Sequence, residues 1–376
     1  MIAHNIAIVI PYRFVPPHNG GQQAAFGFCE FLSKEAPVTV ISSSNNATEG
    51  LPFRFESLFA DRFFKYFNPF VAWRFFCFFR KKNIRTCIIQ QPFIGLMLLP
   101  ITRWLGIRLV VYVHNIEFQR FRSIGKWWWR LLYPIEYFIY RNADFLLFIS
   151  PEDMKEALPL FGLPPHKNLV IPYGTRLIKP PSDKAAARQT LHARHPISAD
   201  EKLILFFGPQ SYKPNQQAVK HIVHDINPFL LQKMGTPYRI LLCGGGLPKE
   251  LDYIKKLQAQ HIHYLDFVED IDTYIKAADV VVNPIQTGGG VKTKIIEAIA
   301  WGTTVVSTET GAKGVERQSC KDKLLVAEDE NWEQLAALLH QALGSASLPT
   351  PDSFYETYHW ARAIQPFVAI LQSKLL

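Results

Sequence analysis

The stretch that decides the fold is VVNPIQTGGGVKTKIIEAIAWGTTVVS, residues 281–307. It begins with an apolar run that is typical of a buried strand, and the glycine triplet Gly288–Gly290 follows. A helical pattern then starts near Lys292 and ends at Gly302, where a second apolar run begins. Glycines let backbone N–H groups approach a phosphate closely, and a helix N-terminus carries partial positive charge. This order predicts a phosphate-binding turn in a parallel α/β sheet.

Charged side chains follow the glycines at fixed positions. Lys292 and Lys294 add positive charge beside the predicted phosphate site. Glu297, one to two turns into the helix, can accept hydrogen bonds from a ribose diol. A glycine-rich loop alone indicates only a tight turn, whereas its combination with paired lysines and an inward glutamate is much more specific for a nucleotide.

Short apolar runs of the same kind recur along the chain and alternate with amphipathic stretches. This alternation predicts an α/β protein with doubly wound parallel sheets, because buried parallel strands are short and rich in β-branched and aromatic residues. The predicted strands form two series, at 6–10, 38–42, 86–90, 109–113, 145–150 and 169–172, and then at 203–208, 239–244, 279–285 and 303–308.

The length of 376 residues favours two domains, at roughly 150 residues per domain. A stretch rich in Pro, Ser, Ala, Arg and His, at 179–200, separates the two strand series. We therefore predict an N-terminal Rossmann-like domain at 1–176 and a C-terminal one at 177–358. A last helix at 359–376 is expected to pack back on the first domain. Ligands of such sheets bind outside the carboxyl ends of the strands.

Composition narrows the class of partner. Five scattered cysteines without a Cys-x-x-Cys pair argue against a disulfide framework or a zinc site and fit a reducing compartment. The chain opens directly into a predicted strand, so we expect no secretory signal and a cytoplasmic location. The formal charge of +9 suits phosphates or an anionic membrane, and no nucleic-acid-binding motif is present.

Residues 62–82, RFFKYFNPFVAWRFFCFFRKK, interleave aromatic and basic side chains. Charge interrupts the stretch too often for a membrane-spanning helix. Two alternatives stay open: a core helix with its basic residues in solvent, or an amphipathic surface that rests on anionic lipid.

The glycine-rich segment resembles the donor-site motif of glycosyltransferase family 4, the retaining enzymes with the GT-B fold of two Rossmann-like domains facing across a cleft. In that family two glutamates are separated by seven residues, and the second matches Glu297, which implies a contact to the donor ribose. The first falls at Gly289, so the chain resembles the glycine-rich branch. The resemblance then implies that backbone amides from Gly290 to Thr293, Val291 included, hold the sugar and phosphates.

Other segments fall where this family places its site. Gly20 and Gly21 resemble the glycine loop of the first domain, although a plain strand-to-helix turn is the alternative. His114 follows a strand end where the family often has a histidine near the donor sugar. Lys213 resembles the basic residue that meets the donor pyrophosphate, and the backbone near Val268 matches the nucleobase rim.

Two polar residues have a simpler explanation. Asn215, two residues after Lys213, is as plausible a helix cap as a ligand. Asp270 and Asp272 have the spacing of the metal-nucleotide motif of another class, GT-A, but acidic residues also suit a helix start, which we favour.

The resemblance implies a retaining hexosyl- or related transferase that moves a sugar from a nucleoside-diphosphate sugar to a hydroxyl of a glycan or lipid-linked acceptor. His114, Lys213 and Lys292 are its expected catalytic residues, and neither a metal nor a further cofactor is expected. Cell-surface polysaccharide biosynthesis at the inner face of the membrane is the expected setting. A sugar-nucleotide epimerase of the same fold and a degenerate nucleotide-sugar-binding scaffold are the alternatives.

Overall fold

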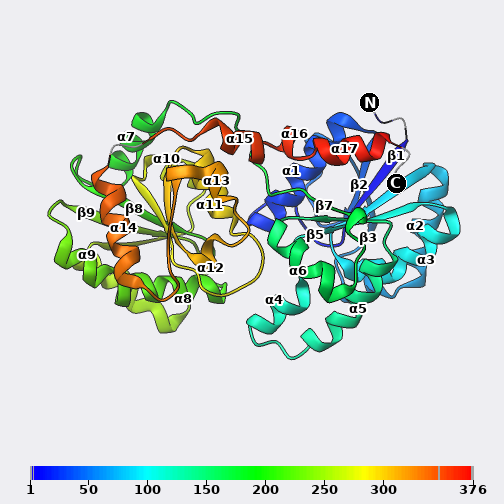
Figure 1. The fold of residues 1–376 in the computed structure, drawn as a ribbon, viewed down its shortest axis with the longest axis horizontal. Coiled ribbons are helices and arrows are strands. Elements are labelled where there is room, and N and C mark those ends of the chain that lie inside the picture. Colours follow the sequence, from blue (N-terminus) through cyan, green and yellow to red (C-terminus); the bar gives the residue numbers. More distant parts are fainter. Residues whose placement is uncertain (1, 3, 346–347, 374–376) are drawn as a thin grey trace. The chain divides into compact units, whose positions relative to one another are not determined.

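Two parallel sheets carry the fold in the structure of the chain, a computed structural model that describes residues 2, 4–345 and 348–373 (Figure 1). The first unit comprises Met1–Arg176, Gly289–Val291 and Tyr358–Leu376, and the second comprises Leu177–Gly288 and Lys292–Thr357. In the described residues each unit contains one sheet with helices on its faces. The predicted α/β class with two doubly wound parallel sheets is therefore confirmed.

The first sheet has seven parallel strands in the order β3-β2-β1-β4-β5-β6-β7. Val9 of β1 lies opposite Ile41 of β2 on one side and Ile89 of β4 on the other. The strands are β1 (Asn5–Ile10), β2 (Val38–Ser43), β3 (Arg54–Phe59), β4 (Ile84–Ile89), β5 (Arg108–Val113), β6 (Phe145–Phe148) and β7 (Asn168–Val170).

Side chains of these strands alternate between two core layers, as the two-residue period of a strand requires. Val9, Ile89 and Val111 point to the layer covered by α2 (Pro69–Lys81), α3 (Gly95–Leu105), α5 (Trp129–Asn142) and α6 (Pro151–Phe161). Ile8 and Val110 point to the opposite layer, which is covered by α1 (Gly20–Glu35), α16 (Trp360–Ala363) and α17 (Gln365–Gln372).

The second sheet has six parallel strands in the order β10-β9-β8-β11-β12-β13. They are β8 (Lys202–Phe207), β9 (Tyr238–Cys243), β10 (Ile262–Asp266), β11 (Val280–Asn283), β12 (Thr304–Thr308) and β13 (Leu324–Ala327). One face is covered by α8 (Lys213–His221), α9 (Asn227–Lys233) and α14 (Trp332–Gly344). In the same unit, α7 (Lys184–Arg194) packs against α10 (Ile271–Ala277), and α11 (Thr293–Ala300) connects β11 to β12.

The chain returns to the first unit after α15 (Asp352–Tyr358). The indole of Trp360 lies so close to the backbone at Gly27 and Gly174 that an added Cβ at either position would stand within 2.4 Å of it. Thr175 also exchanges backbone hydrogen bonds with Tyr358 and Trp360, at 2.7 and 3.0 Å. These contacts fix the C-terminal helices to α1 and to the segment that leaves β7.

Candidate functional site

In the second unit, the turn after β8 packs against the turn after β9 backbone to backbone. Gly208 and Gly244 have φ angles of +135° and +144°, and a Cβ on Gly244 would lie 1.9 Å from the carbonyl oxygen of Gly208. The N–H of Gln210 donates to the carbonyl oxygen of Gly245 at 2.8 Å. No side chain fits between these loops, so glycine is required there.

The glycine loop after β11 packs against the start of α8. Gly288 has φ +86°, and a Cβ there would lie 2.7 Å from the hydroxyl of Tyr212 and 3.1 Å from Pro214. Thr287 donates its hydroxyl to Gln217 Oε1 at 2.7 Å. Lys292 Nζ donates to the carbonyl oxygen of Gly288 at 3.1 Å and so closes the loop on itself. The turns after β8 and β11 therefore form one connected structure.

Lys294 lies inside this structure. Its Nζ donates to Asn215 Oδ1 at 3.1 Å and lies 4.2 Å from the centre of the Phe206 ring. Burial, together with the charge of Lys292, lowers the pKa of Lys294 to about 7. Asn215 Nδ2 donates in turn to the carbonyl oxygen of Pro209 at 2.8 Å. Asn215 is the third residue of α8 and does not cap it, so the capping interpretation is wrong.

Neither α8 nor α11 has a side-chain cap at its N-terminus in the described part of the chain. Lys213 is the exposed first residue of α8, and Thr293 is the first residue of α11. Glu297 lies half-buried in the second turn of α11. Uncapped amides at helix starts are favourable partners for an anion, since helix N-termini carry partial positive charge.

The turn after β10 contains Val268, half-buried, and beside it Phe267, whose side chain is 68% exposed. Asp266 Oδ1 accepts the N–H of Phe267 at 2.9 Å and shapes this turn. The sequence pattern did not single out Phe267, because one exposed aromatic in a turn has no periodicity to mark it. Asp270 precedes α10 and pairs with Arg194 at 2.7 Å, while Asp272 lies in the first turn of that helix.

In the first unit, a cavity of about 210 Å³ lies at the carboxyl ends of β1, β4 and β5. Gly21, His114 and Gln90 are among its lining residues. His114 Nε2 and Gln90 Oε1 are buried and have no hydrogen-bond partner among the described residues. Burial lowers the pKa of His114 to about 4, so its imidazole is neutral at physiological pH. Beside the ion pair of Glu117 and Arg120, which also lines it, the cavity thus presents neutral polar atoms, which suit the hydroxyl groups of a sugar.

A buried glutamate side chain positions the segment after His114 through two hydrogen bonds. Glu136 of α5 is fully buried and accepts the N–H groups of Glu117 and Phe118, both at 2.8 Å. Burial raises the pKa of Glu136 to about 7. Glu117 itself pairs with Arg120 and accepts from Asn115 Nδ2 at 3.3 Å. Sequence patterns do not reveal Glu136, because it lies 22 residues beyond His114 within an aromatic helix.

Gly20 and Gly21 are the first two residues of α1. Asn19 caps this helix by accepting the N–H of Gln22 at 3.0 Å, and Gln22 Oε1 accepts the N–H of His18 at 2.7 Å. Neither glycine has a positive φ, and a Cβ on Gly21 would make ordinary contacts. The structure therefore shows no steric need for glycine at Gly21, although this residue does line the cavity.

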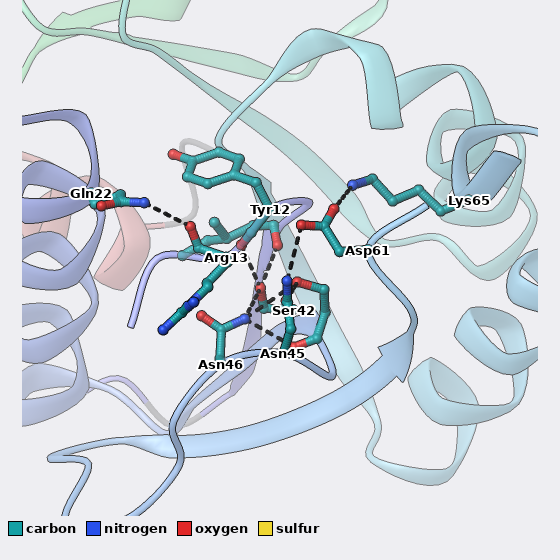
Figure 2. Close-up of polar contacts among 10 residues, drawn as sticks. Tyr12, Arg13, Gln22, Ser42, Asn45, Asn46, Asp61 and Lys65 are labelled. Carbon is teal, nitrogen blue, oxygen red and sulfur yellow. Dashed lines mark hydrogen bonds and ion pairs between the residues drawn. The ribbon is translucent and has the colours of Figure 1, made fainter. Parts of the chain in front are cut away.

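The loop between β1 and α1 is clamped by the end of β2 (Figure 2). The hydroxyl of Ser42 lies 2.7 and 2.9 Å from the carbonyl oxygens of Ile10 and Tyr12. Asn46, which is 8% exposed, accepts the N–H groups of Phe14 and Val15 at 2.8 and 2.9 Å. These bonds hold Tyr12 at the cavity, of which it is a lining residue.

The site residues expected from the sequence thus lie in both units, and Gly21 and His114 line the cavity of the first unit. The second unit brings together Gly288, Lys292, Lys294, Glu297 and Lys213 around the ends of β8 and β11. Val268 lies at the end of β10, and the middle of the glycine loop, Gly289–Val291, is grouped with the first unit. Their roles stay predictions.

Sequence profiles of two families together span both units. The profile described as Glycosyltransferase Family 4 matches residues 18–177, and that described as Glycosyl transferases group 1 matches residues 201–345. Both halves of the chain thus match glycosyltransferase profiles, and the resemblance to glycosyltransferase family 4 is confirmed. No curated protein matches the chain significantly.

Solved structures of glycosyltransferases share the fold. Sucrose-phosphate synthase from Thermosynechococcus elongatus is 16% identical with a TM-score of 0.70, over 98% of this chain and 95% of that one. HepE from Anabaena, solved with UDP and glucose, is 16% identical with a TM-score of 0.70, over 98% and 99% of the two chains. WaaG, a glycosyltransferase of lipopolysaccharide biosynthesis, is 14% identical with a TM-score of 0.66, over 98% and 100%. The chain therefore has the GT-B fold.

Proposed function

We propose that this glycosyltransferase moves a sugar, with retention, from a nucleoside-diphosphate sugar to a hydroxyl of a glycan or lipid-linked acceptor during cell-surface polysaccharide synthesis. The observation that carries the proposal is the pairing of two helices without side-chain caps, α8 and α11, with Lys213 and Lys292 at the ends of β8 and β11. A diphosphate is the part of the donor that this arrangement suits.

The diphosphate is bound, in this proposal, by the amides of the glycine loop and the first turn of α11. The loop's geometry supports this role, because Gly288 and Gly290 have φ angles of +86° and +70° that expose backbone rather than side chains. Lys292 Nζ, now on the carbonyl oxygen of Gly288, lies on the same loop, and Lys213 opens α8 beside it. Lys294 contacts Asn215 and Phe206, and its protonated form adds positive charge that stabilises the bound diphosphate without contacting it.

The nucleoside is assigned to the adjoining strand ends. Glu297, in the second turn of α11, accepts the ribose hydroxyls. The turn at Val268 provides backbone groups for the base edge, and the exposed ring of Phe267 offers a stacking face. HepE, whose structure contains UDP and glucose, has the same fold and supports a nucleotide-sugar donor here.

Sugar transfer requires the anomeric carbon to exchange one oxygen for another. The acceptor hydroxyl oxygen bonds to that carbon, the bond to the diphosphate oxygen breaks with its electron pair, and the leaving phosphate takes the acceptor's proton. Lys213, Lys292 and the loop amides stabilise the charge that develops on the diphosphate, which needs no metal in this proposal. His114, neutral because burial lowers its pKa to about 4, orients the sugar and does not protonate it.

A thermal-shift screen with UDP-, GDP-, ADP- and CMP-sugars tests the donor. A ligand present at 100 times its Kd stabilises the folded state by about 2.7 kcal/mol, so one class of donor is expected to raise the melting temperature by several degrees. The absence of any shift with all four classes would contradict the proposal. Once the donor is found, the products formed without an acceptor distinguish the three alternatives. A transferase hydrolyses the donor slowly, and an epimerase releases a changed nucleotide sugar. A scaffold releases no product.

A further inference from the structure

We propose that the first unit docks on an anionic lipid bilayer through an aromatic–basic face made by three segments of one helical layer. From residues 62–82, the face comprises Phe64 of η1 (Phe63–Tyr66), Phe67 after it, and Phe70 and Trp73 of α2. It also comprises Trp104 of α3, Trp127 between α4 (Glu117–Ser123) and α5, and Leu131 and Phe138 of α5. The inference is independent of the proposed sugar transfer.

The helix α2 is apolar on both sides, which a core role alone does not explain. Val71, Phe75 and Phe79 recur every fourth residue and are buried in the core against the sheet. On the other side Phe70 is 79% and Trp73 64% exposed. The core alternative for residues 62–82 therefore holds for one side of α2, while the other side presents aromatic rings to solvent.

The same arrangement recurs at two places that the sequence pattern did not mark. Trp104, at the end of α3, is 83% exposed. In the segment that leads into α5, Trp127 is 72% exposed, and Leu131 and Phe138 of α5 are 57% and 50% exposed. The opposite side of α5 is buried through Glu136, Ile139 and Tyr140. Large apolar side chains this exposed are typical of an interaction surface.

These segments lie in one layer of the unit. Residues of α2, α3 and α5 belong to the same core cluster, on the sheet face that carries Val9 and Val111. The helix α3 packs against α2 and against α5, so it lies between them (Figure 1). The outward sides of the three helices thus belong to the same side of the sheet.

The positive charge around the aromatic–basic face indicates that its partner is an anionic bilayer. Residues 62–82 contain six basic and no acidic residues; five of the six are exposed, and the buried Lys65 pairs with Asp61. Residues 119–142 contain five basic residues, of which all but Arg120, paired with Glu117, are exposed, and their one acidic residue, Glu136, is fully buried. Aromatic rings bordered by Lys and Arg match the interface between lipid headgroups and acyl chains, where Trp is enriched and anionic headgroups attract cations. Among the described helices none is long and apolar enough to cross a membrane, so the contact is peripheral.

Vesicle flotation of the full chain tests the proposal. The protein is expected to float with phosphatidylcholine vesicles that contain phosphatidylglycerol, to stay in solution with pure phosphatidylcholine, and to dissociate at high salt. The double variants Phe70→Ser/Trp73→Ser and Trp127→Ser/Leu131→Ser are each expected to lower the partition coefficient about fivefold or more. These side chains are exposed, so circular dichroism and melting temperature should match the parent protein.

The matched control is Ile178→Ser/Leu231→Ser, which removes exposed apolar side chains of the second unit, 68% and 46% exposed, and should leave flotation unchanged. Absence of binding to the anionic vesicles, equal binding to neutral ones, or an equal loss in the control would overturn the proposal. Gel filtration without lipid tests whether a second copy of the chain covers this face instead. A dimer that both variants of the face dissociate would also overturn the proposal.

Discussion

Lys294 Nζ donates a hydrogen bond to Asn215 Oδ1 across 3.1 Å and so joins the first turn of α11 to the first turn of α8. These two helices follow β11 and β8, the strands whose ends carry the candidate diphosphate site. Because Asn215 also donates to the carbonyl oxygen of Pro209, the half-buried Lys294 supports both loops. The pair therefore determines how the two loops are held relative to each other.

The Lys294→Met variant should change how stability depends on pH. The pKa of Lys294 is about 7 in the folded chain against an ordinary 10.5, so between these values the unfolded chain binds more protons at this residue. Stability from this group therefore rises with pH through that window, at up to about 1.4 kcal/mol per pH unit, and the methionine variant lacks this rise.

Urea unfolding at pH 7, 8 and 9 checks the effect of Lys294. The free energy of unfolding of the parent protein minus that of Lys294→Met should grow with pH. Lys220→Met, which replaces an exposed lysine of the neighbouring helix α8, is the control and should show no such trend. A difference for Lys294→Met that stays constant with pH would mean that the lysine is not enclosed as described.

Glu136→Gln should show the opposite sign in a lower window. Burial raises the pKa of Glu136 to about 7 from 4.5, so the folded chain binds more protons between these values and the parent protein loses stability as pH rises. Glutamine does not titrate, and its single carbonyl oxygen replaces the two oxygens that accept the N–H groups of Glu117 and Phe118. The variant should be less stable than the parent at pH 5, by about 1–3 kcal/mol, and the gap should narrow toward pH 8. If Glu136 were charged throughout, thermal unfolding over this range would instead show a gap that stays nearly constant with pH.

Asn46→Ala should destabilise the first unit. Its side-chain oxygen is the acceptor for the buried N–H groups of Phe14 and Val15, and leaving a buried donor unpaired costs about 1–3 kcal/mol each. We expect a loss of about 2–4 kcal/mol in urea unfolding. The control Asn45→Ala removes a neighbouring, solvent-exposed hydrogen bond to Asp61 (Figure 2). A loss of stability in Asn45→Ala as large as that in Asn46→Ala would contradict the role of Asn46.

The sequence revealed every central strand and the edge strand β7, but not the other three edge strands. All ten expected strands are present, whereas β3, β10 and β13 were missed, and each of these three lies at an edge of its sheet. Central strands such as β1 are buried on both faces and read as continuous apolar runs. The edge strand β3, RFESLF, carries Arg54 and Glu56 in its exposed half, and so lacks that signal.

The site was visible from sequence where backbone conformation dictates residue type. Gly288 is required by its φ of +86° and its contact with Tyr212, and such a glycine is readable in a motif. The partners of site residues were not visible in the sequence. Asn215 lies 79 positions from Lys294, to which it is hydrogen-bonded, and Glu136 accepts the N–H of Glu117 from the next helix. Periodicity describes one element at a time, whereas these contacts depend on the packing of several.

Calorimetric titration with the nucleoside diphosphate of the best donor tests the central claim, that the ends of β8 and β11 bind the donor, most directly. Glu297→Ala and Lys292→Ala each remove a proposed contact to it, and a hydrogen bond to a charged group contributes about 1.5–3 kcal/mol. We predict that each variant weakens the affinity by about 10- to 100-fold, while the control Lys220→Ala binds like the parent. Unchanged affinity in both Glu297→Ala and Lys292→Ala would contradict the assignment.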